Sequence, residues 1–127
     1  MKKLCAGGLL ALLAATGSVH AAGVPALGTL LAGAPAQQVE WAQRYEHGEG
    51  VARDPGRAIA LYCAAAARGS VDAQYRLGWM YAMSRGVARD DALAAAWFRL
   101  AAAKGDPQAQ QMLKAMGRQP ARAASCD

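Results

Sequence analysis

The residues that could carry acid–base or metal chemistry are few and lie close together. Glu40, Glu46 and Glu49 occur in one short stretch, with His47 among them. Paired carboxylates are what glycoside hydrolysis requires, and histidine with acidic residues is a common metal-binding set. A metal site needs three or four clustered donors, however, and the only other histidine, His20, lies near the N-terminus. His47 is therefore interpreted as an ordinary loop residue.

The acidic residues are better explained by structure than by catalysis. Asp54 and Asp90 each stand just before an apolar stretch, as helix-capping residues do. None of the acids is expected in a cleft that would raise its pKa. No Glu-Ser pair of the kind used by lytic transglycosylases occurs in the chain. The sequence therefore predicts a protein that is not an enzyme and that needs neither a metal nor a cofactor.

Residues 1–21 have the layout of a secretory signal peptide. Lys2 and Lys3 precede an apolar run over residues 4–15, and Val19-His20-Ala21 supplies the residues that a signal peptidase reads. The run is shorter than the ~20 residues that a bilayer span needs. We expect cleavage after Ala21, a periplasmic or secreted protein, and no stable membrane insertion afterwards. An uncleaved N-terminal anchor is the alternative.

The net charge does not indicate a nucleic-acid partner. The chain has 14 Lys and Arg against 9 Asp and Glu, a net charge of +5. Loss of Lys2 and Lys3 would leave 12 basic and 9 acidic residues, a net charge of +3. The basic residues are scattered and form no stripe that could follow a phosphate backbone.

Residues 37–117 contain an internal repeat with a period of 36 residues. Residues 37–72 and 73–108 are identical at 13 of 36 positions, and five of these are consecutive, Gly50–Asp54 on Gly86–Asp90. A third copy stops near Gly117, after one helix. Self-similarity at such a period is typical of helical repeat arrays.

Each unit predicts two helices joined by a loop. In the second unit Leu77 and Tyr81 recur on one helix face, Gly86 marks the loop, and Asp90 caps a second helix over about residues 91–104. The other predicted cap residues are Asp54, Ser70 and Asp106. A single hairpin would leave an apolar face exposed, so we expect the hairpins to stack.

A string of residues recurs at fixed places in both units. In the second unit it comprises Leu77, Gly78, Tyr81, Gly86, Asp90, Trp97, Phe98 and Gly105, and its matches in the first include Tyr45, Gly50, Asp54 and Gly69. With the 36-residue period, this string resembles the Sel1-like repeat, a relative of the tetratricopeptide repeat. Trp41, Ala42 and Ser84 depart from the usual pattern, and Ser84 is expected to loosen its loop.

The resemblance implies an all-α fold, a short α/α solenoid of two full repeats and one further helix. It also implies a protein that holds other proteins together, often in bacterial envelopes and beside peptidoglycan-cleaving enzymes. It implies no chemistry of its own.

The first helix of each unit is the candidate binding surface, because such helices line the concave side of these arrays. Tyr75, Trp79 and Met83 recur every four residues, and Val39 and Gln43 are the counterparts of the first two. Exposed aromatic residues at this spacing can anchor a peptide or a partner helix. The alternative is that the segment before the array or the tail after it covers them.

Two cysteines remain once Cys5 leaves with the signal peptide. Cys63 aligns with Arg99, so its face is expected to be exposed, and a free exposed thiol is disfavoured in an oxidising compartment. We therefore predict a disulfide from Cys63 to Cys126 that ties the tail, residues 118–127, across the array. Residues 22–36, rich in Ala, Gly and Pro, are predicted to be a linker with a helical turn over the first hairpin.

These features predict a non-catalytic periplasmic module for protein–protein interaction or scaffolding. Its partner is a protein or peptide that the sequence does not identify, and cell-wall-associated proteins are candidates. Two alternatives stay open. The chain is the N-terminal repeat portion of a larger cell-wall enzyme such as a lytic transglycosylase, because the array stops in mid-hairpin. Or it is a structural protein that self-associates through the open end of its solenoid.

Overall fold

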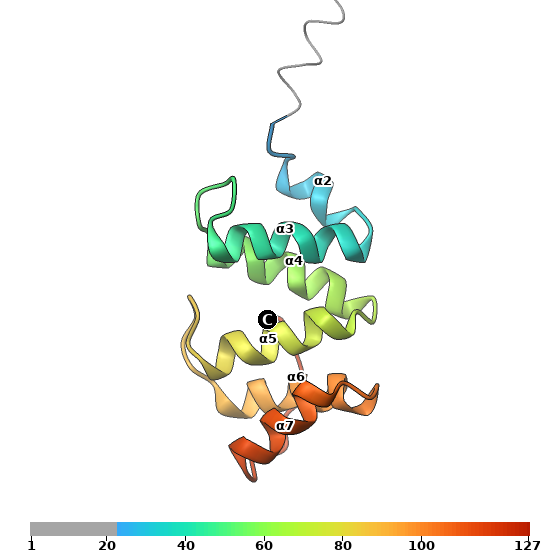
Figure 1. The fold of residues 1–127 in the computed structure, drawn as a ribbon, viewed down its shortest axis with the longest axis vertical. Coiled ribbons are helices and arrows are strands. Elements are labelled where there is room, and N and C mark those ends of the chain that lie inside the picture. Colours follow the sequence, from blue (N-terminus) through green and yellow to red (C-terminus); the bar gives the residue numbers. More distant parts are fainter. Residues whose placement is uncertain (1–22) are drawn as a thin grey trace, which may run out of the picture.

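The computed structural model describes residues 23–127, which form helices and loops without a strand (Figure 1). The predicted signal peptide, residues 1–21, lies outside the described residues. The helices are α2 (Leu27–Leu31), α3 (Pro35–His47), α4 (Pro55–Ala67), α5 (Val71–Ala82), α6 (Asp91–Ala103) and α7 (Pro107–Met116). In this part of the chain, no helix has the length and apolar character needed to span a membrane.

The helices stack in chain order along one axis (Figure 1). Helix α3 pairs with α4 and α5 with α6, while α4 contacts α5 and α6 contacts α7. The predicted all-α solenoid of two hairpins and one further helix is therefore confirmed.

Side-chain caps mark the start of the last four helices, α4 to α7. Each cap oxygen accepts a hydrogen bond from the backbone amide three residues later, at 2.9–3.2 Å. The four caps are Asp54, Ser70, Asp90 and Asp106, as predicted. They satisfy amides that the first turn of a helix leaves without partners.

Large apolar side chains fill the space between the hairpins. Leu61, Leu77 and Phe98 are fully buried. A methyl group added to Gly78 would lie 2.7 Å from the Phe98 ring, so the missing side chain is what lets α5 approach α6. Tyr81 is only partly buried, although its spacing predicted a core position.

The loop of the second hairpin keeps its turn without the usual first glycine. Ser84 has a φ of 55°, in the left-handed region where its counterpart Gly48 has a φ of 74°. The Ser84 hydroxyl donates to the Val87 carbonyl at 3.0 Å and holds the loop. The turn is therefore kept, and a looser loop stays a prediction.

Helix α2 covers the first hairpin. It contacts α3 and α4, and its Leu30 is 1% exposed. The Gln38 amide donates to the Leu31 carbonyl at 2.7 Å, and the Arg68 guanidinium donates to the Gly33 carbonyl at 2.6 Å. The segment before the array is thus fastened to it, with the predicted helical turn.

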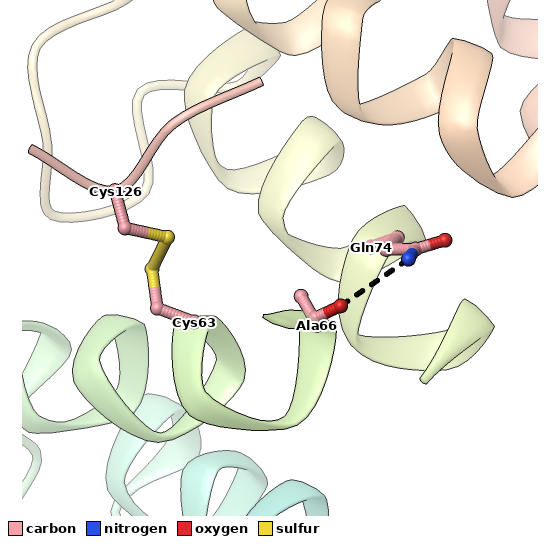
Figure 2. Close-up of a disulfide and its surroundings, with 4 residues drawn as sticks. All are labelled: Cys63, Ala66, Gln74 and Cys126. Atoms are coloured by element: carbon pink, nitrogen blue, oxygen red, sulfur yellow. Dashed lines mark hydrogen bonds between the residues drawn. A yellow bond between two sulfur atoms is a disulfide. The ribbon is translucent and has the colours of Figure 1, made fainter. Parts of the chain in front are cut away.

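Closely similar contacts recur one repeat later. Gln74 donates to the Ala66 carbonyl at 3.3 Å (Figure 2), and Lys104 donates to the Gly69 carbonyl at 3.0 Å. Helix α2 therefore contacts the first repeat in the way that the end of α4 contacts the second repeat.

The tail lies against the second helices of the two hairpins. The Gln119 carbonyl accepts from Arg99 on α6 at 3.3 Å, and Arg122 pairs with the α6 cap Asp90. Near the end of the chain, Cys126 is bonded to Cys63 on α4, with 6.0 Å between their Cα atoms (Figure 2). The tail thus crosses the array from α6 to α4.

Candidate protein-binding groove

A groove of about 350 Å³ lies on the first helices of the hairpins. Its lining residues are Glu46 and His47 from α3, Asp72, Tyr75, Arg76 and Trp79 from α5, and Gln108 from α7. Neither the segment before α3 nor the tail contributes to this lining. The segment before the array and the tail after it therefore both leave the groove open beside Tyr75 and Trp79.

The two aromatic side chains form a wall that is anchored in the core. The Tyr75 ring lies 5.6 Å from the ring of buried Phe98. Trp79 packs against both clusters of buried residues and carries the Arg85 guanidinium 5.1 Å above its ring. Tyr75 and Trp79 are half-buried, so each presents part of its ring to the groove and the rest to the core.

The other three predicted binding residues lie elsewhere. Val39 is 9% exposed and belongs to the core, so its prediction as a surface residue is wrong: α3 turns this position inward. Gln43 is half-buried, and its carbonyl accepts from Arg76 at 3.1 Å in the amide orientation that satisfies both groups. Met83 is 50% exposed and lines a different hollow, beside Met112 and Met116.

Glu46 lies at the base of the groove and is 2% exposed. One carboxylate oxygen accepts a hydrogen bond from the Tyr62 hydroxyl at 2.8 Å. The expectation that none of the acids lies in a cleft is therefore wrong for Glu46. Glu46 follows Val39 and Ala42 at helical spacing, which places it on the buried face of α3. This spacing is the sequence signal that predicts its burial.

A guanidinium and an imidazole lie near the Glu46 carboxylate, each beyond hydrogen-bond distance. The Arg85 Nη2 atom is 4.0 Å from one oxygen, and the His47 Nε2 atom is 3.9 Å from the other. Burial raises the pKa of Tyr62, and the hydrogen bond to Glu46 raises it further. Tyr62 therefore stays a hydroxyl donor at neutral pH.

Arg76 carries the positive charge on the groove lining itself. Its Nε atom donates to Asp72 at 3.2 Å. Burial lowers the pKa of Arg76, but the neighbouring Tyr62 and Asp72 outweigh burial and leave that pKa raised. The groove thus offers carboxylates, a guanidinium and two aromatic rings, which are groups suited to binding. Among residues 23–127 there is no cluster of three metal-ligating side chains.

Residues 38–70 and 71–106 each match the family model of the Sel1 repeat. The chain belongs to the Sel1 repeat family. The matched Sel1 units lie within two residues of the boundaries 37–72 and 73–108 that the internal identities predicted. Sel1 repeats generally mediate protein–protein interaction, and proteins built from them are generally non-catalytic scaffolds.

Two solved structures are similar to this Sel1 repeat chain. The crystal structure of a Sel1 repeat protein from Oxalobacter formigenes is 40% identical with a TM-score of 0.60, and the match covers 68% of this chain and 66% of that one. The protective antigen c5321 of uropathogenic Escherichia coli, which displays an SLR fold, is 36% identical with a TM-score of 0.66 over 73% of this chain. That match covers only 21% of the antigen, so this chain spans about a fifth of it. No curated protein matches the chain.

Proposed function

We propose that this Sel1 repeat protein is a non-catalytic module for protein–protein interaction or scaffolding in the periplasm, and that it binds its partner through the groove. The observation that carries the proposal is the half-buried pair Tyr75 and Trp79 on the wall of an open groove. Aromatic side chains of this kind, fixed by packing and presented in a concavity, are typical anchors of protein interfaces.

The proposed location rests on the N-terminal pattern and on the cysteines. The separation of Cys63 and Cys126 suits a disulfide, and such bonds persist in oxidising compartments. Mass spectrometry of the non-reduced protein from a periplasmic fraction tests both points. We expect a chain that begins at Ala22 and resists alkylation. A retained N-terminus or two alkylated thiols in the folded protein would refute the corresponding point.

The groove is tested by exchanging its aromatic residues for those of the first repeat. Tyr75→Val with Trp79→Gln introduces the counterparts Val39 and Gln43, which the same fold accommodates. Alanine would be a poorer choice, because both side chains also pack on the core. We expect the variant to keep its helical circular dichroism and to lose partners that the mature protein captures from periplasmic extract.

A matched control is Leu100→Gln, which changes an exposed side chain on α6, outside the groove. This variant should capture the same partners as the wild type. Capture that survives the exchange of Tyr75 and Trp79 would show that the groove is not the binding site.

The alternative is that the repeats serve a larger cell-wall enzyme such as a lytic transglycosylase. It is favoured by Leu113 and Met116 on α7, which are half-buried, whereas their counterparts Leu77 and Met80 are fully buried. A further helix packed on α7 would cover them. An in-frame continuation of the coding DNA with a Glu-Ser motif would establish this alternative, and a stop codon after Asp127 would remove it.

A further inference from the structure

The base of the groove holds two polar residues of the first repeat, and the second repeat has apolar residues at the same two positions. Glu46 and Tyr62 in the first repeat correspond to Ala82 and Phe98 in the second. Ala82 is 8% exposed and Phe98 is fully buried, so the apolar pair fills the equivalent space. Burying a carboxylate is costly unless it is well paired. The stacking of the hairpins therefore does not explain Glu46.

Only one oxygen of the Glu46 carboxylate accepts a hydrogen bond within the described part of the chain. Its Oε2 atom accepts from Tyr62 at 2.8 Å. Within the described part of the chain, no donor lies at hydrogen-bond distance from Oε1, and the nearest cation, Arg85, has its Nη2 atom 4.0 Å away. The Oε1 atom is thus available to a donor that enters the groove.

The charges on the lining favour a positively charged donor. Two carboxylates, Glu46 and Asp72, line the groove together with one guanidinium, that of Arg76. Arg76 is already engaged by Asp72 at 3.2 Å and by Gln43. The remaining polar lining residues, His47 and Gln108, are formally neutral, with histidine counted as uncharged at pH 7.

The aromatic wall also suits a cation. The faces of tryptophan and tyrosine rings attract ammonium and guanidinium groups. The Arg85 guanidinium, 5.1 Å above the Trp79 ring, is such a contact within the chain itself. Arg85 also approaches Glu46, without a hydrogen bond to the carboxylate. Arg85 and Arg76 are therefore the neighbouring positive charges that oppose entry of a further cation.

We propose that the groove binds a lysine side chain of the partner polypeptide, whose ε-ammonium donates to Glu46 Oε1. Asp72 supplies a second carboxylate, and the rings of Tyr75 and Trp79 flank the aliphatic part of the side chain. Lysine fits better than arginine, because its compact ammonium group on a flexible stem can reach a recessed acceptor. The volume of about 350 Å³ lies at the small end of ligand sites. This assignment rests on the proposed function, since it names the group of the partner that the groove receives.

The test is an NMR titration of the oxidised mature chain with Nα-acetyl-lysine methylamide. The matched probe Nα-acetyl-norleucine methylamide has a similar stem without the charge. We expect saturable shifts at the Trp79 indole and the α5 amides, with a Kd of about 1–10 mM for so small a ligand. The norleucine probe should bind about tenfold more weakly or not at all, which corresponds to losing one charged contact.

Two variants assign the effect to Glu46. Glu46→Gln keeps an acceptor for Tyr62 and should weaken binding of the lysine probe about tenfold. Glu40→Gln makes the same change on the same helix, where the side chain is 59% exposed and pairs with Arg44, and should bind like the wild type. The double variant Glu46→Ala with Tyr62→Phe copies the second repeat and should lose the lysine response while staying folded.

Several results would overturn the assignment. These are equal shifts with the two probes, tighter binding of Nα-acetyl-arginine methylamide, no saturable shift up to about 100 mM, or unchanged binding by the Glu46→Gln variant. The proposed function fails separately. If the exchange of Tyr75 and Trp79 abolishes partner capture while the lysine probe does not bind, the groove is the interface and lysine is not its ligand.

Discussion

The hydrogen bond from Tyr62 to Glu46 places a buried carboxylate between α3 and α4. A buried polar pair of this kind contributes little stability relative to an apolar pair that fits the same space. The second repeat supplies that apolar pair, Ala82 and Phe98. The second repeat therefore serves as a comparison that shows what Glu46 contributes to the stability of the first.

Removing one partner of the pair should be worse than removing both. In Glu46→Ala the Tyr62 hydroxyl loses its acceptor, which should lower the free energy of unfolding by about 1–3 kcal/mol. Adding Tyr62→Phe should restore most of the loss, because no buried polar group is then left unpaired. Urea unfolding followed by circular dichroism measures both. A double variant less stable than the single one would contradict this account.

Asp90 should make the stability of the protein depend on pH in the acidic range. The Leu93 amide lowers the pKa of Asp90, and the contact with Arg122 lowers it further. The lowered folded pKa means that the stabilisation is complete above the usual value of 3.8 and is lost as the pH falls through the folded value.

The measurement is thermal unfolding between neutral and acidic pH. Asp90→Asn keeps an oxygen that can cap α6 but carries no charge. It should show a smaller loss of stability on acidification than the wild type, and at neutral pH it should melt at a somewhat lower temperature because the Arg122 contact is gone. Parallel curves for the two proteins would mean that Asp90 does not couple to pH.

Each hairpin loop has a glycine at the same repeat position, Gly50 or Gly86, but the two glycines have different surroundings. Gly50 and Gly86 have φ angles of 72° and 77°. A methyl group at Gly50 would meet no atom within 4 Å, whereas at Gly86 it would overlap the Pro55 side chain. The loop of the second hairpin therefore rests on the start of α4, and only there does a close approach require glycine.

Alanine at these positions should separate backbone conformation from packing. Gly50→Ala should lower the free energy of unfolding by about 1–2 kcal/mol, the cost of a left-handed residue with a Cβ atom. Gly86→Ala should cost roughly 1–3 kcal/mol more, because the added methyl also displaces Pro55. Urea midpoints of the two variants measure the difference. Equal losses of unfolding free energy in the two variants would show that the loop moves away from Pro55 without strain.

At the level of elements, the chemistry of adjacent residues predicts where helices begin. The periodicity of helix faces predicts less completely which side chains are buried. The caps Asp54 and Asp90 follow from rules of adjacent residues, so they could be predicted. Helix α2 was foreseen only as a turn, because five residues carry no helical period. The charge of Glu46 is typical of a surface residue, whereas its position on the inner face of α3 determines its buried environment.

The tail joins the two repeats into one unit. It contacts α6 through Gln119 and Arg122 and ends at the bond between Cys126 and Cys63 on α4. It runs over the second helices and so leaves the groove on the first helices open. The sequence predicts this pairing from the expected exposure of Cys63 in an oxidising compartment. The groove depends on side chains from three helices that only the assembled array brings together.

Loss of the disulfide should weaken the whole molecule. The bonded cysteines are 63 positions apart, and closing a loop of that size contributes about 4 kcal/mol in the chain-entropy model. Cys63→Ala with Cys126→Ala should therefore unfold at a much lower urea concentration with unchanged helical circular dichroism. Reduction of the wild type should reproduce the shift. Unfolding that is the same with and without reductant would show that the tail adds no constraint.

The path of the tail also determines how the protein would respond to being pulled from its two ends. With the Cys63–Cys126 bond in place, tension applied at the C-terminus passes from Cys126 directly into α4. Helices α5, α6 and α7 lie between the two cysteines and would carry no load. Among the described residues, a stretched molecule would extend only through the part before Cys63, which contains α2, α3 and most of α4. Most of the groove wall, on α5, would therefore remain folded while the protein is under mechanical force.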